Sequence, residues 1–276
     1  MQIFSRSPRG GTPPKLSKDV VGPFDAERRV AGIAPLAVHG PYIINLASPE
    51  ALMWKRSTDL YREEYTRAAQ LQADYLVTHV GSHRGDGEAA GIRRVSEAIN
   101  RTLDGVAPSV MILLENTAGS GQGIGSQFEQ LAAIRDGVEA KASVGICLDT
   151  AHLFAAGHPI HTEDGLTDVV ASFDRAVGLE QLKLIHLNDS KVPFDARVDR
   201  HWHIGKGHIG LEAFGRIVNH PRLSTVPFIL ETPKTPARPG DREGRAGEQD
   251  DRRNLSTVRR LARQAAAPRR MRVAVR

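Results

Sequence analysis

The stretch VGICLDTAHLFAAGH, residues 144–158, carries a polar pair at the end of an apolar run. The run VGICL is continuous, which is typical of a strand buried on both faces in a parallel sheet. Asp149 ends this run and His152 follows three residues later. A carboxylate and an imidazole are costly to bury without partners. A lone histidine beside an apolar run is more often a satisfied core or surface residue than a ligand, so the other strands decide the matter.

Similar apolar runs recur along the whole chain. The further runs are residues 2–4, 33–39, 75–80, 110–116, 182–189 and 227–233. Helical patterns separate them, at residues 50–72, 91–104, 126–137, 165–177, 211–219 and 252–264. This alternation predicts parallel strands with right-handed helical crossovers. An open doubly wound sheet and a closed barrel both fit the alternation, and residues 233–250 are interpreted as a mobile loop.

The composition is that of one large domain. The chain has 276 residues, which suits a single α/β barrel, and a single cysteine, Cys147, which cannot form an internal disulfide. A reducing cytoplasm is therefore expected. The N-terminal residues lack an apolar core of signal length, and no stretch approaches the roughly 18 apolar residues of a membrane span. We expect a soluble cytoplasmic protein without a membrane partner.

The basic charge of the chain is concentrated at its C-terminal end. The net charge is +5, but residues 259–276 hold seven arginines and no acidic residue. Without that segment the net charge is −2. The overall charge is therefore weak support for a nucleic-acid partner. We predict one domain over residues 1–265 and a basic, disordered tail over residues 266–276.

Six consecutive apolar runs end in a residue that can bind a divalent metal. These residues are His39, His79, Glu115, Asp149, His186 and Glu231. In a barrel of parallel strands the carboxyl ends meet at one mouth, where they would form a single site. Loops add His152 and the pair Asp199 and His201, whose i, i+2 spacing places both on one side of an extended segment. Nine such residues are too many for one tetrahedral zinc and fit about three ions.

Long segments of the chain resemble the endonuclease IV family of apurinic/apyrimidinic endonucleases. They are VHGPYIINLAS, THVGSH, LLENTAGSGQGIG, GICLDTAHLFAAG, IHLNDSK, RVDRHWHIGKGHIG and ILETPK, and the likeness runs from about residue 2 to about residue 265. The resemblance implies a TIM (β/α)8-type barrel with a trinuclear zinc cluster. It assigns His39, His79 and Glu115 to one zinc, Glu115, Asp149, His186 and Glu231 to a second, and His152, Asp199 and His201 to a third ion, either zinc or manganese.

The resemblance also implies a reaction. The family hydrolyses the phosphodiester 5′ to an abasic site in duplex DNA and leaves a 3′-hydroxyl and a 5′-deoxyribose phosphate. The expected enzyme is a phosphoric diester hydrolase of the deoxyribonuclease IV type, acting in base excision repair at the nucleoid, as a monomer. Glu115 would bridge two ions and Glu231 would orient or deprotonate the attacking water. Arg9 and Tyr42 match the positions that enter the DNA, although Arg9 could equally be a solvated arginine.

One departure from the family pattern concerns the N-terminus. Met1 directly precedes the segment QIFSRSPR, so the first strand and helix of the family are absent and about seven strands are expected. Such a barrel exposes two sheet edges. Two alternatives stay open: a sugar isomerase or epimerase of the xylose isomerase-like barrels, which needs one metal, and a truncated, inactive relative that only binds DNA. A count of bound metal ions distinguishes the sugar isomerase or epimerase from the nuclease, and an incision assay distinguishes the inactive relative from it.

Overall fold

A seven-stranded parallel sheet forms the centre of the protein. The computed structural model describes residues 1–235 and 247–266. The strands, in their spatial order, are β1 (Gln2–Ile3), β2 (Ala37–His39), β3 (Tyr75–His79), β4 (Met111–Glu115), β5 (Val144–Asp149), β6 (Leu182–His186) and β9 (Phe228–Ile229). All pairs are parallel. The seven predicted strands are confirmed, and sequence order is also spatial order, as in a TIM-type barrel.

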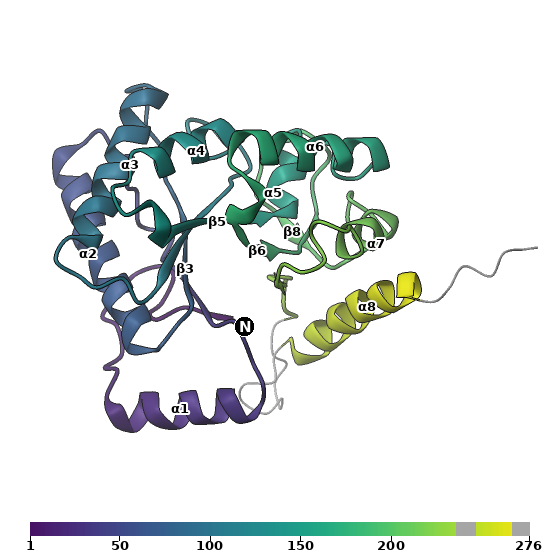
Figure 1. Ribbon diagram of the computed structural model, residues 1–276, viewed down its shortest axis with the longest axis horizontal. Helices are drawn as coiled ribbons and strands as arrows, with labels where there is room; N and C mark the ends of the chain where they lie inside the picture. Colours follow the sequence, from purple (N-terminus) through teal and green to yellow (C-terminus); the bar gives the residue numbers. More distant parts are fainter. Residues whose placement is uncertain (236–246, 267–276) are drawn as a thin grey trace, which may run out of the picture.

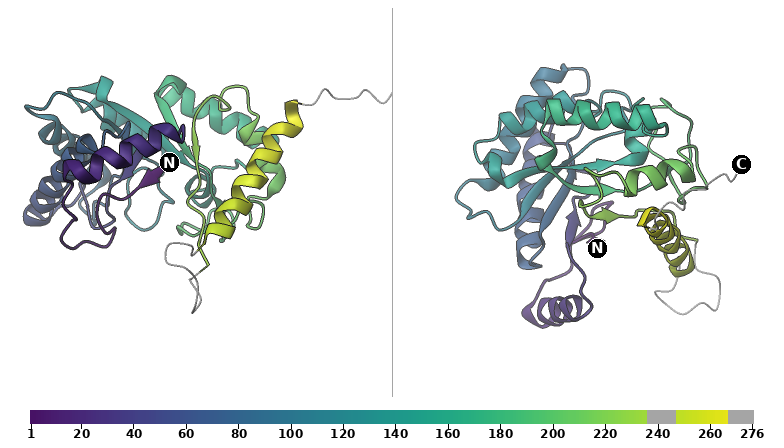
Figure 2. Two further views of the ribbon diagram at one scale, coloured as in Figure 1. Left: turned by 90° about the horizontal axis from the view of Figure 1, so that it is seen from below. Right: turned by 45° about the vertical axis from the view of Figure 1, so that its right-hand side comes forward.

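Helices cover the outer face of this sheet (Figure 1). They are α1 (Lys18–Val30), α2 (Ala51–Gln70), α3 (Glu88–Leu103), α4 (Phe128–Asp136), α5 (Thr150–Ala155), α6 (Glu163–Ala176), α7 (Leu211–Val218) and α8 (Glu248–Ala266). Short 3-10 turns, η1 (Lys141–Ser143) and η2 (Leu179–Gln181), precede β5 and β6, and β7 (Asp189–Ser190) pairs antiparallel with β8 (His201–Trp202). In both views of Figure 2, α1 and α8 lie on opposite sides of the N-terminus, where the ring of helices is interrupted.

Three helical segments differ from the prediction. Helix α1 was not predicted, because Gly22 and Pro23 in its middle are ordinary turn signals, yet Pro23 lies inside the helix. Helix α5 is too short to show helical periodicity. Helix α8 begins at Glu248, so the end of the predicted loop 233–250 is helical, and residues 236–246 lie outside the described part. The predicted tail also lies outside it, apart from Ala266 at the end of α8.

Two apolar clusters lie on the two sides of the sheet. The larger cluster packs between the strands and the surrounding helices. The smaller one fills the barrel interior with one residue from each of five strands: Ala37, Val77, Leu113, Cys147 and Leu184. Each of these residues precedes a predicted metal ligand by two positions, and side chains alternate along a strand with period two. The apolar interior layer therefore lies directly beneath the layer of ligands.

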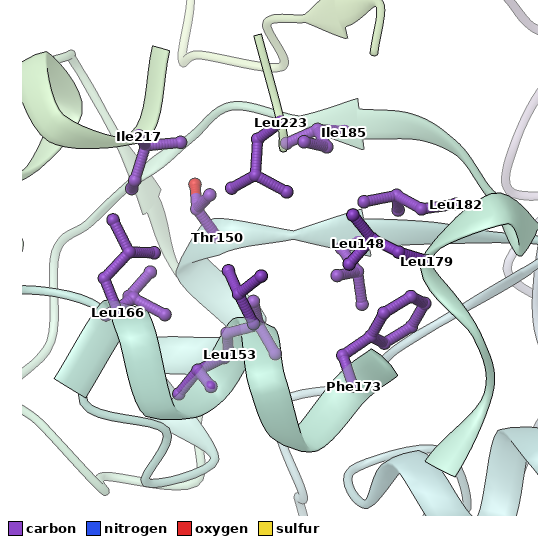
Figure 3. A pocket seen from close by; sticks show the side chains of 13 residues that line it. Leu148, Thr150, Leu153, Leu166, Phe173, Leu179, Leu182, Ile185, Ile217 and Leu223 are labelled. Atoms are coloured by element: carbon purple, nitrogen blue, oxygen red, sulfur yellow. The ribbon is translucent and has the colours of Figure 1, made fainter. Parts of the chain in front are cut away.

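The side of β5 and β6 that faces α6 is closely packed. Figure 3 shows a small cavity there, lined by side chains such as Leu148, Leu166 and Phe173. Its volume is about 30 Å³ and its exposed lining is apolar. A water molecule needs two to four polar partners, which this lining does not offer. The cavity is therefore a packing gap in the core. Across the described residues, none of the helices is both long enough and apolar enough to span a bilayer.

Truncating the interior layer should destabilise the barrel. Leu113 is fully buried, so Leu113→Ala is expected to lower the free energy of unfolding by about 2–5 kcal/mol through lost burial and a residual cavity. Leu52→Ala is the matched control, because Leu52 on α2 is 62% exposed and should cost under about 0.5 kcal/mol. Urea unfolding of the metal-free protein measures both. Equal effects for the two variants would contradict the assignment of Leu113 to the interior.

Candidate metal centre

Glu115 lies at the centre of the site. Strand register places His79 beside Glu115 and Asp149 beside His186. The Oε2 atom of Glu115 is 3.1 Å from both His39 Nε2 and His79 Nε2, whereas its Oε1 atom is 2.9 Å from His186 Nδ1. The two carboxylate oxygens thus face two different groups of side chains, which is the arrangement of a carboxylate that bridges two ions.

The end of β5 places the next two residues. Asp149 is the N-cap of α5, and its Oδ1 accepts a hydrogen bond from the backbone N–H of His152 at 2.8 Å. This capping bond, which is favourable for aspartate at a helix start, turns the chain back over the mouth of the barrel. The ring of His152 is then fixed by Nδ1–H, which donates to the carbonyl of Asn116 at 2.9 Å. Its Nε2 atom points toward the remaining members of the site.

Those members are Asp199, in the loop before β8, and His201, the first residue of β8. The Oδ2 atom of Asp199 is 3.1 Å from His152 Nε2, and its Oδ1 atom is 3.3 Å from His201 Nε2. The Nε2 atoms of His152 and His201 are 3.3 Å apart, and Asp149 Oδ2 is 3.5 Å from His201 Nε2. The side chain of Asp199 is 46% exposed, whereas that of His152 is buried. This end of the site therefore faces solvent.

The structure brings all nine predicted ligands together at one mouth. Three sets offer ligand atoms within 4.8 Å of one another: His39, His79 and Glu115; Glu115, Asp149, His186 and Glu231; Asp149, His152 and His201. The first two sets coincide with the predicted division. In the third, Asp149 stands where Asp199 was predicted, and Asp199 still contacts both histidines.

The imidazole rings are oriented as metal ligands are. His39 Nδ1–H donates to the carbonyl of Gly40 at 2.7 Å, and His201 Nδ1–H points to the carbonyl of Glu231 at 3.3 Å. Together with the bond from His152 to Asn116, these contacts leave the Nε2 atoms of three rings directed into the site. A carbonyl that receives the other ring N–H of a ligating histidine fixes both its tautomer and its orientation.

The charge of the site also fits bound cations. Its four carboxylates belong to Glu115, Asp149, Asp199 and Glu231, and in the described part of the chain their side chains form ion pairs with histidines alone. Glu115 and Asp149 are fully buried. Buried negative charges require pairing, so either protonated imidazoles or bound cations must balance these carboxylates. The donor set of imidazoles and carboxylates suits divalent zinc.

The mutual pairing of these groups is visible in their pKa values. Burial alone would raise the pKa of Glu115, but the neighbouring His79 and His186 hold that pKa well below its ordinary value. Burial would likewise lower the pKa of His152, but the charges of Asp149 and Asp199 outweigh it and raise the pKa to about 10. The carboxylates thus stay ionised, in the form that binds cations.

Sequence reasoning missed or misplaced some supporting residues. Asn188 and Asp189 follow the strand that carries His186, and both hold other parts of the site. Asn188 Nδ2 donates to Asp149 Oδ2 at 2.6 Å, and the backbone N–H of Glu231 donates to Asn188 Oδ1 at 2.7 Å. Asp189 accepts backbone N–H bonds from residues 190, 207 and 209. Asn116, whose Oδ1 accepts from the backbone N–H of Asp149 at 2.6 Å, was not predicted, although it directly follows a predicted ligand.

The two predicted DNA-contacting residues lie on the same rim. The ring of Tyr42 is 5.6 Å from that of His39 and 6.0 Å from that of His79, and Tyr42 is 60% exposed. The backbone N–H of Tyr42 donates to the carbonyl of Pro8 at 3.1 Å, and Arg9, which directly follows Pro8 in sequence, is exposed. This loop is anchored below by Arg67, which donates to Ser5 Oγ at 2.8 Å.

Comparison with known proteins agrees with this geometry. A family model described as xylose isomerase-like TIM barrel matches residues 1–258. Probable endonuclease 4 of Chloroflexus aggregans is 44% identical over 270 residues, covering 97% of this chain and 90% of the relative. Probable endonuclease 4 of Halothermothrix orenii is 43% identical over 243 residues, covering 88% and 87%.

Solved structures show the same relationship. The crystal structure of endonuclease IV from Thermus thermophilus matches with a TM-score of 0.80 at 37% identity, covering 95% of this chain and 88% of that one. A D-tagatose 3-epimerase-like protein matches with a TM-score of 0.67 at 17% identity, covering 96% and 90%, which is a likeness of fold alone. The fold and the site thus define a xylose isomerase-like TIM barrel with a candidate metal centre. Within that class, the chain belongs to the endonuclease IV family.

Zinc is expected to stabilise the folded protein. An ion that binds only the folded state adds about 2.7 kcal/mol per site at a free concentration 100 times its Kd. Adding Zn²⁺ to chelator-treated protein should therefore raise the melting temperature, and His152→Ala should reduce both this rise and the bound zinc. His158→Ala is the matched control, because His158 donates to Ser126 O outside the site. A melting temperature indifferent to Zn²⁺, measured by calorimetry, would contradict the metal centre.

Proposed function

We propose that this chain is a DNA-repair endonuclease that uses about three zinc ions to cut duplex DNA 5′ to abasic sites, leaving a 3′-hydroxyl and a 5′-deoxyribose phosphate. The observation that carries the proposal is the convergence of nine imidazole and carboxylate ligands, with Glu115 shared between two sets. Membership in the endonuclease IV family supports it, since the relatives are named as endonucleases. Damaged double-stranded DNA is the proposed partner.

The division of the ligands supports three ions. His39, His79 and Glu115 would hold one, and Glu115, Asp149, His186 and Glu231 a second. His152 and His201, with Asp199 or Asp149, would hold the third, which is either zinc or manganese. When bound, the ions neutralise phosphate charge and lower the pKa of water, as phosphodiester hydrolysis near neutral pH requires.

Glu231 is the side chain that we propose handles the proton of the attacking water. Its side chain is 19% exposed, whereas that of Glu115 is 1% exposed, so Glu231 is the more accessible of the two. Burial would raise the pKa of Glu231, but His186 holds that pKa below its ordinary value, so the group is an ionised carboxylate that accepts a proton or hydrogen bond. Asn188 and Gln2 hold its two oxygens.

Tyr42 and Arg9 are proposed to recognise the lesion. Tyr42 presents an exposed ring beside the rings of His39 and His79, at the rim of the site. An abasic nucleotide has no base in the stack, so its extrusion costs less than that of a paired nucleotide. An aromatic ring can fill the gap that is left, since it stacks on the face of any neighbouring base, whatever the DNA sequence.

Incision of a duplex oligonucleotide with one abasic site is the test of this function. The zinc-loaded wild type should cut 5′ to the lesion, and His152→Ala or Glu231→Gln should lower kcat at least about 100-fold, because each removes a ligand or a proton acceptor. His158→Ala should retain wild-type kcat. Gel analysis of the product ends identifies the 3′-hydroxyl. A zinc-loaded chain that leaves the duplex intact, or cuts at the 3′ side, would contradict the proposal.

Tyr42→Ala should weaken binding to the lesion. Loss of one stacking ring corresponds to about 1–3 kcal/mol, or roughly 5- to 150-fold in Kd, for an abasic duplex. Tyr42→Phe is the control, because it keeps the ring and should bind within about twofold of wild type. Fluorescence anisotropy in the His152→Ala background avoids cleavage. An equal loss of affinity for undamaged duplex would show that Tyr42 contributes to general DNA binding and not to the lesion.

A sugar isomerase or epimerase remains the alternative enzyme. The set of Glu115, Asp149, His186 and Glu231 would suffice for one ion that polarises a sugar. The fold of the D-tagatose 3-epimerase-like protein is compatible with it. The five other ligands have no role in such a reaction, which favours the nuclease. Saturation at one ion per chain, with no incision, would support the epimerase, and lesion binding without incision would indicate an inactive relative.

A further inference from the structure

Gln2 links the two end strands of the sheet at the metal centre. Strand β1 pairs only with β2, and β9 pairs only with β6, so within the described residues no backbone ladder joins the first strand of the sheet to the last. The register pairs Gln2 with Ala37, a member of the barrel interior, so Gln2 also faces inward. Its amide reaches across the opening to side chains from β6 and from the residues after β9.

The two contacts of this amide determine its orientation. Gln2 Nε2 donates to Glu231 Oε1 at 2.6 Å, because an ionised carboxylate can only accept. The opposite atom, Gln2 Oε1, is 2.8 Å from His186 Nε2, and an amide oxygen can only accept. His186 Nε2 therefore carries the proton. With Nε2 turned to Gln2, it is Nδ1 of His186 that faces Glu115 and Glu231, at 2.9 and 3.0 Å, and Nδ1 is the atom that an ion at this set would take.

His186 differs from its neighbours in this respect. His39, His152 and His201 turn Nδ1 toward backbone carbonyls and present Nε2 to the site. A backbone carbonyl is present whatever the side chain, whereas the partner of His186 is the side chain of a single residue. Substitution of that single residue would therefore remove the contact that orients the His186 ring.

We propose that Gln2 is a positioning residue: its amide holds His186 with Nδ1 directed at the metal and holds Glu231 beside it, joining β1 to the β6–β9 side of the barrel. The proposal rests on the metal-dependent function proposed above. Phe4 occupies the next inward position on this segment, with its ring 5.3 Å from that of His39, so the segment contributes no metal ligand of its own. Its polar contribution to the site comes from Gln2.

Zinc titration of Gln2→Leu tests this role. Leucine suits the apolar interior layer but removes both amide contacts. Loss of such a supporting partner lowers metal affinity by about 10- to 100-fold, so at limiting Zn²⁺ the variant should retain about one ion fewer than wild type. Its kcat for abasic-site incision should fall while KM is unchanged, because Gln2 lies beneath the ligands. The visible spectrum of the Co²⁺-loaded protein should change at one of the sites.

Two further variants keep the test decisive. Gln130→Leu is the matched control: Gln130 is buried, accepts from Gly125 N–H at 2.7 Å and donates to Glu88, all outside the metal centre, so its zinc content and cobalt spectrum should stay those of wild type. Gln2→Met preserves side-chain length if Gln2→Leu does not fold, and it should show the same zinc loss.

The outcomes separate the two proposals. Wild-type zinc affinity, spectrum and kcat in folded Gln2→Leu or Gln2→Met would overturn the positioning role, even if the wild type cuts abasic DNA. A wild type that binds zinc but cuts no DNA would overturn the proposed function, and the zinc titration would still decide the role of Gln2. Equal zinc loss in Gln130→Leu would attribute the effect to general destabilisation and would also overturn the role.

Discussion

The shared carboxylate of Glu115 is the interaction on which the site depends. It is fully buried, and its two oxygens face histidines from three other strands, β2, β3 and β6. A buried charge of this kind is tolerated only with close partners. Removing the Glu115 side chain would leave the neighbouring imidazoles without a common carboxylate partner. The two sets of candidate ligands that share Glu115 would then have no residue in common. The other candidate ligands at the mouth of the barrel are arranged around this shared carboxylate.

The regular geometry of the parallel strands is enough to bring these polar side chains together. Period-two alternation stacks an inward polar residue on an inward apolar one, as Glu115 on Leu113 or Asp149 on Cys147. Parallel register then brings neighbouring strand ends level with each other. The helix cap adds His152, because the same carboxylate that faces the site also accepts the backbone N–H of His152 in the first turn of α5. Strand ends and the first turn of α5 thus carry the buried candidate ligands, and a loop carries the exposed Asp199.

The strands and the positions of the candidate ligands could be located from the sequence because both follow from patterns local to the chain. Continuous apolar runs identify buried parallel strands, and the polar residue that ends each run is visible in the letters alone. The supporting contacts could not be predicted in this way. Asn188 forms hydrogen bonds with Asp149 and Glu231 because the fold brings their distant segments together. Gln2 and His186 form a hydrogen bond although they are 184 positions apart in sequence. Helix α1 was hidden by Gly22 and Pro23, which favour turns when read without their packing.

The opening between the two end strands of the sheet and the metal centre therefore depend on the same side chains. The strands at the two ends of the order, β1 and β9, form no ladder with each other among the described residues, and a sheet edge without a partner is a liability. At the ligand end, hydrogen bonds from Gln2 to Glu231 and from His186 to Gln2 take the place of that ladder. Because Glu231 and His186 are also candidate ligands, binding of an ion and closure of the barrel act on the same side chains. By linkage, whatever favours one must favour the other.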